Sequence, residues 1–265
     1  MTNLTLAVLA ADGTMRHATD GSDEVTLSWR GAYEPGDRIV IRCDEDPVHL
    51  VMKLDVCLAE SHVLLHGGYF EFPIPTGDAQ KAYGKGWAFA DERHWAYVRV
   101  EDPREAASWR NVALNAHDLR IPREPALAFP HVTTNVSCDN PQFLARNVID
   151  GVFETSSHGS WPHESWSVCG HDDAWVQVDF GEPVVADELR LYLRADFPHD
   201  TWWNRAMVET SDGVRLPVSL AKTGQRQTVD LGGRTIEWLR LSGFERAEET
   251  GFPGLSQLEV WGRRA

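Results

Sequence analysis

The chain has 265 residues, of which 42% are hydrophobic, and a formal net charge of −15 from 25 Lys and Arg against 40 Asp and Glu. This length suits one large hydrophobic core or two ordinary ones. The acidic residues are spread along the chain, so its negative field disfavours nucleic acid or an anionic membrane surface as a partner. The composition favours a protein that binds neutral or cationic ligands.

The compartment is predicted from the first apolar run and from the cysteines. The run Leu4–Ala11 has only eight residues and no basic residue before it, so it predicts neither a signal peptide nor a membrane span. The four cysteines are few and unevenly spaced, a pattern that favours reduced thiols. We therefore expect a cytoplasmic protein.

The first half of the chain reads as one strand after another, separated by turns such as Asp12-Gly13 and Gly67-Gly68. This pattern predicts a β-sandwich over residues 1–122, of no family that we identify. The stretch Arg104–Leu119 fits either a short amphipathic helix or an irregular segment. Pro122 and Pro125 then interrupt regular structure, which places a domain boundary there. The expected strands cover 4–10, 25–29, 38–42, 49–58, 62–66 and 95–100.

The second half, residues 123–265, starts with a helix-like apolar turn over 143–149, broken at Asp150-Gly151. An aromatic-rich loop follows, and then the strand Ala174–Phe180, which Gly181-Glu182-Pro183 is expected to end. Many short strands at this spacing predict a second sandwich or jelly roll. These strands cover 187–193, 205–210, 214–218, 227–231, 236–241 and 254–262.

The helical turn, the Asp-Gly break, the aromatic-rich loop and the strand Trp-Val-Gln-Val-Asp-Phe-Gly together resemble the coagulation factor 5/8 type C, or discoidin-like, galactose-binding domain. The closing stretch, in which Glu259 precedes Trp261 and Gly262, looks like the last strand of that family. The resemblance spans about Phe129–Arg263. It implies a jelly roll in which loops at one end bind carbohydrate.

The resemblance also implies a structural calcium ion at the Asp-Gly break. Calcium binds six to eight oxygens from carboxylates, hydroxyls and backbone carbonyls. Five residues at positions matching the family's site are the expected ligands: Asn147, Asp150, Val152, Thr155 and Glu259.

Aromatic rings that stack on sugars, together with polar side chains that fix hydroxyls, gather in two loops of the second half. One loop covers 158–166 and the other 194–205. Most of the eleven tryptophans must lie in the core, including Trp175, Trp238 and Trp261, and of Trp202 and Trp203 only one ring can face outwards. The carbohydrate-binding candidates are His158, Trp161, His163, Arg194, Asp196, Trp202, Trp203 and Arg205.

Two further kinds of chemistry have weak signals. His158, His163, Cys169 and His171 lack the spacing of a zinc site. The chain has no nucleophile elbow and no phosphate-binding loop, so catalysis would need His94 or His117 in a cleft between the domains.

The sequence therefore favours an all-β protein with two β-sandwich domains and a non-catalytic, carbohydrate-binding function. Two alternatives stay open. One is a carbohydrate-active enzyme with an interdomain site, and the other is a protein–protein adaptor, with a protein partner or a second copy of the chain bound on a flat apolar patch.

Overall fold

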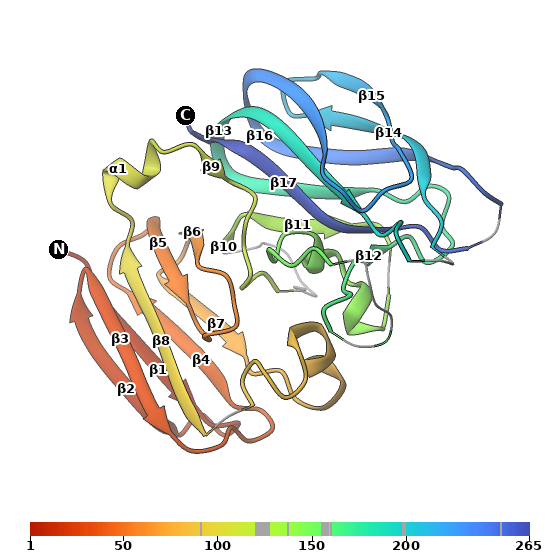
Figure 1. Cartoon of the computed structure of the whole chain (residues 1–265). Helices are drawn as coiled ribbons and strands as arrows, with labels where there is room; N and C mark the ends of the chain where they lie inside the picture. Colours follow the sequence, from red (N-terminus) through yellow and green to blue (C-terminus); the bar gives the residue numbers. More distant parts are fainter. Residues whose placement is uncertain are drawn as a thin grey trace.

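The protein is described by a computed structural model that covers residues 1–90, 92–119, 128–136, 138–154, 159, 161–197, 200–249 and 251–265. Strands dominate the chain, and they form two packed domains, with the N-terminal one below the C-terminal one in Figure 1. The predicted all-β class with two β-sandwich domains is confirmed.

The N-terminal sandwich packs two antiparallel sheets around one core, and alternate side chains along a strand point into that core. Strand β3 is the clearest case, because Val25, Leu27 and Trp29 are buried while the residues between them are exposed. One sheet has the order β2 (Met15–Ser22), β1 (Asn3–Leu9), β4 (Arg38–Cys43), β7 (Tyr69–Pro73). The other has the order β10 (Ala128–Phe129), β6 (Ser61–Leu65), β5 (Val48–Lys53), β8 (Arg93–Val100), β3 (Glu24–Arg30).

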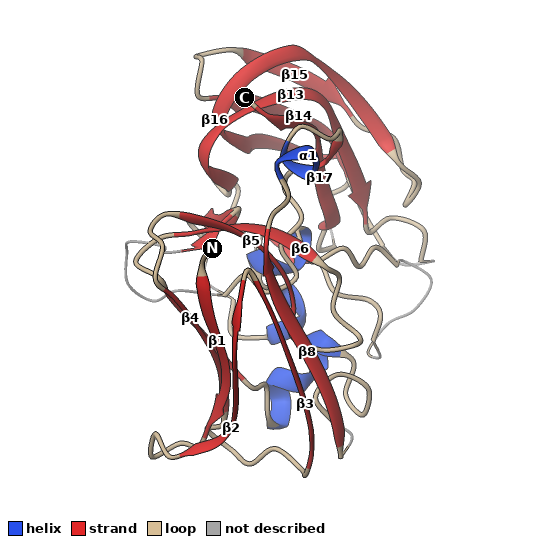
Figure 2. Ribbon diagram, turned by 90° about the vertical axis from the view of Figure 1, so that its left-hand side faces the viewer, coloured by secondary structure: helices blue, strands red, loops and turns tan. Residues whose placement is uncertain are grey.

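The C-terminal domain is built from one antiparallel sheet whose long strands curve over its core, as Figure 2 shows for β13 and β16. Register shifts in β13, between Asp179 and Val184 and between Ala186 and Glu188, accompany the bend. The main order is β12 (Trp166–Ser167), β17 (Gly254–Arg264), β13 (Val176–Leu193), β16 (Gln227–Arg246), β14 (Trp203–Thr210), β15 (Arg215–Ser219). In addition, β11 (His131–Thr134) pairs with β13 and β9 (Arg110–Asn111) pairs with β17.

The prediction that Gly181-Glu182-Pro183 ends a strand is wrong, because β13 continues through it. Gly181 has a φ of 74°, and a Cβ atom there would lie 2.5 Å from the Phe129 ring, so the glycine allows a close approach inside a bulged strand. In the same way, the two strands expected over 227–241 are one strand, β16.

Helical structure is short. The helix-like turn at 143–149 consists of the 3₁₀ turns η2 (Pro141–Phe143) and η3 (Ala145–Val148). The only helix in the stretch 104–119 is the single turn α1 (Pro103–Ala106), whose N-terminus is stabilised by a capping box between Asp102 and Glu105. Strand β9 follows it. A further 3₁₀ turn, η1 (Gly77–Tyr83), lies in the N-terminal half.

The expected boundary at residues 122 and 123 falls between two short strands, and each of them pairs with a sheet of the domain on the other side of the boundary. Before it, β9 joins the C-terminal sheet, and the Val112 amide donates to the Val260 carbonyl at 2.7 Å. After it, β10 joins the N-terminal sheet beside β6. The two domains are therefore tied together by backbone hydrogen bonds on both sides of the boundary.

The tryptophans divide differently from the prediction. Trp166 and Trp203 are each 1% exposed and pack with Phe244 in the C-terminal core. Trp175, Trp238 and Trp261, which were expected in the core, are only partly buried. They lie on outer faces against arginines, with Arg240 over Trp175 and Trp238 and with Arg190 over Trp261.

Candidate carbohydrate site at the end of the C-terminal sandwich

A cavity of about 580 Å³, here called the end cavity, lies where β13 ends and β17 begins. Segments that are distant in the sequence build it, from residue 143, from 165–169, from residues 194 and 200, and from 251–254. Its lining residues are Phe143, Ser165, Ser167, Cys169, Arg194, Asp200, Gly251, Phe252 and Gly254.

Arg194 is the central polar residue of the end cavity. It directly follows β13, and its backbone amide donates to the Gly254 carbonyl at 2.9 Å. Its guanidinium donates to the His163 carbonyl and lies 3.8 Å from the Asp200 carboxylate. Burial lowers the pKa of Arg194, while the charge of Asp200 raises it. The pair therefore presents fixed polar groups whose charges offset each other.

The remaining wall combines polar and apolar groups. The buried Ser165 hydroxyl has no hydrogen-bond partner among the described residues, and a Cβ atom at Gly254 would lie 3.1 Å from its oxygen. Burial, followed by a hydrogen bond with Cys138, raises the pKa of Cys169 to about 11, so this thiol lines the cavity as a neutral group. Phe252 is 76% exposed at the rim.

Of the seven predicted carbohydrate contacts that the structure describes, only Arg194 lines the end cavity. His163 is 3% exposed, and its ring is held by the Gln142 side chain and the Gly159 amide. It supports Arg194 through its carbonyl group. His158 lies outside the described residues.

The tryptophan predictions split by burial. The prediction for Trp203 is wrong, because its ring lies in the core, where no ligand can stack on it. Trp202 is half-buried beneath the Lys222 ammonium, 4.9 Å from the ring centre, and does not line the cavity. Trp161 packs against Trp87 of the N-terminal half, with ring centres 6.1 Å apart.

Asp196 and Arg205 also lie away from the end cavity. Asp196 accepts a hydrogen bond from the Gly224 amide at 2.7 Å, and Arg205 is an exposed strand residue 3.9 Å from Glu245. The prediction missed Phe252 and Ser165. Phe252 stands between Gly251 and Pro253 just before the closing strand, and an aromatic residue in such a turn is a signal that could have revealed it.

The predicted calcium ligands have mixed surroundings. Asp150 is buried and has no ion-pair partner within 4 Å in the described part of the chain, which suits a cation ligand. The Glu259 carboxylate accepts from the Trp261 indole at 2.7 Å and lies 3.9 Å from Arg190. The side-chain NH₂ group of Asn147 donates to the backbone carbonyls of Pro141 and Ser165. Thr155 lies outside the described residues. The calcium site stays a prediction that depends chiefly on Asp150.

Zinc has little support from the positions of its candidates. His171 is exposed and Cys169 lines the end cavity, while both ring nitrogens of His163 have partners. Among the described residues, no group of three or more His, Cys, Asp or Glu side chains could hold a metal ion.

The two histidines considered for catalysis lie inside the N-terminal domain. His94 bonds to the Gly31 carbonyl at 2.9 Å and stacks on Trp29. His117 is fully buried and accepts from the Leu54 amide, and burial lowers its pKa to about 3. Neither histidine lines the cavities at the domain junction, so neither stands where the catalytic alternative would need it.

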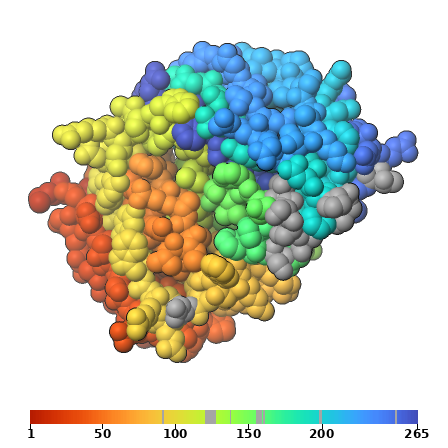
Figure 3. Space-filling view, viewed as in Figure 1, coloured from red at the N-terminus to blue at the C-terminus, as the bar shows by residue number. Residues whose placement is uncertain are grey.

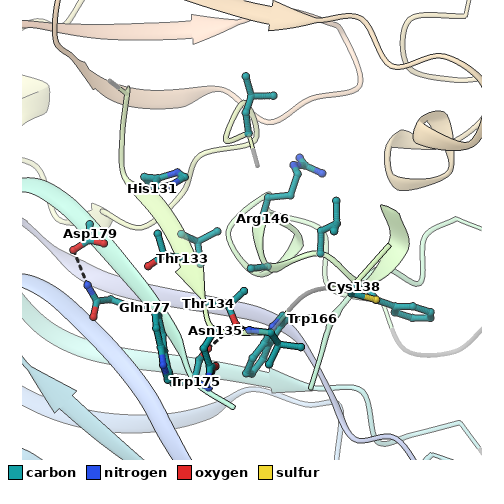
Figure 4. Close-up of a pocket in the computed structure, with 16 residues that line it drawn as sticks. His131, Thr133, Thr134, Asn135, Cys138, Arg146, Trp166, Trp175, Gln177 and Asp179 are labelled. Atoms are coloured by element: carbon teal, nitrogen blue, oxygen red, sulfur yellow. Dashed lines mark hydrogen bonds between the residues drawn. The ribbon is translucent and has the colours of Figure 1, made fainter. Parts of the chain in front are cut away.

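A larger cavity, of about 640 Å³, opens beside β11, with Arg146 of η3 on one side and Trp175, Gln177 and Asp179 on the other (Figure 4). The Gln177 amide donates to Asp179, two residues further along β13 on the same wall, at 2.9 Å. Residues 120–127, which the structure does not describe, adjoin its lining residue Leu119 in the sequence. No site is assigned to this cavity.

The fold and the end cavity define a class: a two-domain β-sandwich protein with a loop-lined pocket at one end of its C-terminal domain. The chain belongs to the family described as a domain of unknown function, DUF7402, whose model matches residues 128–261. No curated protein matches it. No helix among the described residues is long and apolar enough to cross a membrane.

Several solved structures are similar to this chain. A fucose-binding module of Streptococcus pneumoniae has 16% identity and a TM-score of 0.42, covering 58% of this chain and 99% of that one. A chitosan-binding module of a Paenibacillus sp. IK-5 chitosanase/glucanase has 18% identity and a TM-score of 0.38, covering 58% and 99%. The family 32 module of C. perfringens NanJ, in complex with galactose, has 15% identity and a TM-score of 0.36, covering 49% and 91%. Likeness at this level identifies no ligand for this chain.

Proposed function

We propose that the protein binds carbohydrate without catalysis, in the end cavity. The observation that carries this proposal is the Arg194–Asp200 pair, buried beside an exposed aromatic ring, Phe252. The guanidinium supplies several donors in a fixed plane and the carboxylate supplies acceptors, which together suit vicinal hydroxyls. Phe252 offers a flat apolar face for the C–H side of a sugar ring.

The electrostatics of the end cavity favour a neutral ligand. The charges of Arg194 and Asp200 offset each other at 3.8 Å, and the Cys169 thiol is protonated at neutral pH. The Ser165 hydroxyl, buried and without a partner among the described residues, can accept or donate one more hydrogen bond. An uncharged ligand rich in hydroxyls can bond to this hydroxyl without adding a net charge beside the ion pair.

Acid–base catalysis has less support. Two carboxyl groups have a raised pKa because of burial, Asp150, at about 7, and Glu164. Neither lines the end cavity. The two carboxyl groups whose pKa burial raises therefore lie outside the lining of the pocket that we assign to sugar.

A glycan array on the full chain, followed by calorimetry with the best ligand, tests the proposal. We expect Phe252→Ala to weaken binding by about 1 kcal/mol, roughly fivefold, because one stacking face is lost. Arg194→Ala should cost about 1–3 kcal/mol, because hydroxyls lose their partners. Trp95→Ala, which removes a 41% exposed ring on β8 of the other domain, is the matched control.

The exposed position of Phe252 makes it the decisive variant, since its replacement should leave the melting temperature unchanged. Arg194 is buried, so Arg194→Ala could weaken binding by destabilising the fold, and its melting temperature is measured alongside its affinity. Unchanged affinity in the Phe252→Ala variant would overturn the end cavity as the site.

A further inference from the structure

A second cavity, of about 360 Å³, lies where the two domains meet, and it is called here the junction cavity. Segments around residues 60, 111, 152 and 260 build it, so both domains contribute. In Figure 3 the orange, yellow-green, green and dark-blue segments meet near the centre of the visible face. The lining residues are Ala59, Glu60, His62, Arg110, Asn111, Leu114, Gly151, Phe153, Glu259 and Trp261.

His62 is held in one orientation by a buried carboxylate. Its Nδ1 atom lies 2.6 Å from Glu101, whose side chain is 2% exposed. Burial would raise the pKa of Glu101, but bonds from His62 and Arg264 and the charge of Arg110 hold it at about 2. The ionised carboxylate accepts from Nδ1–H, which leaves Nε2 to bond to a ligand. Among the described residues, Nε2 has no partner.

Asn111 and Glu259 are fixed in the same manner. The Asn111 carbonyl oxygen accepts from the amides of Ala113 at 3.1 Å and Val260 at 3.0 Å, so its NH₂ group is left to donate. One carboxylate oxygen of Glu259 accepts from the Trp261 indole at 2.7 Å. The other oxygen has no hydrogen bond within the part of the chain that the structure describes. Each side chain thus has one group bonded internally and one group available to a ligand.

Aromatic rings complete the junction cavity. Phe153 is 50% exposed and rests on Tyr192, with ring centres 4.5 Å apart, so its other face is open to a ligand. Trp261 lies 4.6 Å from Trp109 and is covered by the Arg190 guanidinium at 4.2 Å, which fixes the indole in place. A half-exposed ring beside oriented donors and acceptors is the arrangement that binds sugars.

We propose that the junction cavity is a second carbohydrate site, which takes a neutral or amino sugar residue. Carboxylate oxygens dominate the open groups there: those of Glu60 and Glu259 lie beside His62 Nε2, the Asn111 amide and the Arg110 Nε–H, which has no partner among the described residues. Arg110 lines the wall, but its terminal nitrogens are bonded to Glu101 and to backbone carbonyls. Hydroxyl or ammonium hydrogens match this set, whereas the carboxylate of a uronic acid would be repelled.

Two carbohydrate sites on one chain would let it bind two sugar units of one glycan or two separate glycans. The junction cavity does not depend on the end cavity, because the two share no lining residue. Each site can therefore be removed while the other is kept.

The test uses the full chain carrying Phe252→Ala, so that the end cavity is weakened. Amide and indole resonances are followed by NMR during titration with galactose, glucosamine and galacturonic acid. We expect galactose or glucosamine to shift the signals of Phe153 and the Trp261 indole, with galacturonic acid at least tenfold weaker. Adding Phe153→Ala should weaken the titration at least fivefold, and adding Glu60→Gln should weaken glucosamine most. Glu237→Gln, an exposed glutamate on β16, is the control for lost charge.

The outcomes separate the two sites. Absence of shifts at Phe153 and Trp261 with all three sugars, or shifts that Phe153→Ala leaves unchanged, overturns the junction site. Tighter binding of galacturonic acid also overturns it, because the acceptor-rich wall would then be wrong. If Phe252→Ala abolishes all sugar binding, the junction site fails while the end cavity stands. If binding is insensitive to Phe252→Ala but lost with Phe153→Ala, the junction site stands and the end cavity fails.

Discussion

Replacing the buried acid Asp150 by asparagine should raise the stability of the protein at alkaline pH and remove part of its pH dependence. Asp150 follows η3 and is 5% exposed. One carboxyl oxygen accepts from the Val152 amide at 2.8 Å. Burial raises the pKa of Asp150 to about 7, against the opposing charge of Arg146.

The sign of the effect follows from proton binding. Between pH 3.8 and about 7 the folded protein keeps the Asp150 proton, whereas the unfolded chain has released it. Stability therefore falls as pH rises through this window and is constant above it. The interval from 3.8 to about 7, at about 1.4 kcal/mol per tenfold change in proton affinity, gives about 4 kcal/mol as an upper limit. Asparagine has the shape of the protonated acid and carries no charge.

The assay is urea unfolding of the wild type and of Asp150→Asn at pH 5 and pH 8, with EDTA present. We expect the variant to be more stable than the wild type by up to about 2 kcal/mol at pH 5, where the unfolded chain has already released the Asp150 proton, and by up to about 4 kcal/mol at pH 8. Taking the difference between the proteins removes other titrating groups, such as His117. Asp173→Asn, at a side chain that is 85% exposed, is the control and should show no such difference. Equal differences in unfolding free energy at both pH values would refute the reasoning.

Two further predictions concern the calcium ion and the domain boundary. If calcium binds at Asp150, millimolar calcium should raise the melting temperature of the wild type. The rise should be larger at pH 8 than at pH 5, because the carboxyl group must be ionised to bind calcium. The melting temperature of Asp150→Asn should not respond to calcium. A melting curve of the wild type that does not respond to calcium would count against the site. A protease that cuts within residues 120–127 should leave two fragments that elute together on size exclusion, because β9 and β10 each pair with the other domain. Separation of the fragments under native conditions would contradict this interlocking.

The sequence alone determined the class of the fold and the place of most strands. Alternation along Val25, Leu27 and Trp29 predicts a half-buried strand because successive side chains point to opposite faces, and this rule needs no knowledge of distant partners. Arg194 was found for a similar reason, since a charged residue directly after an apolar strand stands where the chain leaves the sheet. Local order was sufficient in both cases.

Only the tertiary structure decided which faces are covered and which segments meet. Of the neighbours Trp202 and Trp203, alternation predicts that one points inwards, but it does not say which, because the answer depends on packing against Trp166 and Phe244. Gly181 looks like the end of a strand until Phe129 is seen packed against it.

Both cavities depend on pairings across long stretches of chain. Asn111 lies beside Trp261, although 150 residues separate them in the sequence, and the Arg194 amide bonds to the Gly254 carbonyl. Hydrophobic periodicity records the direction of each side chain but not the identity of its neighbour, so neither Phe252 nor Phe153 could be assigned to a cavity before the strands were paired.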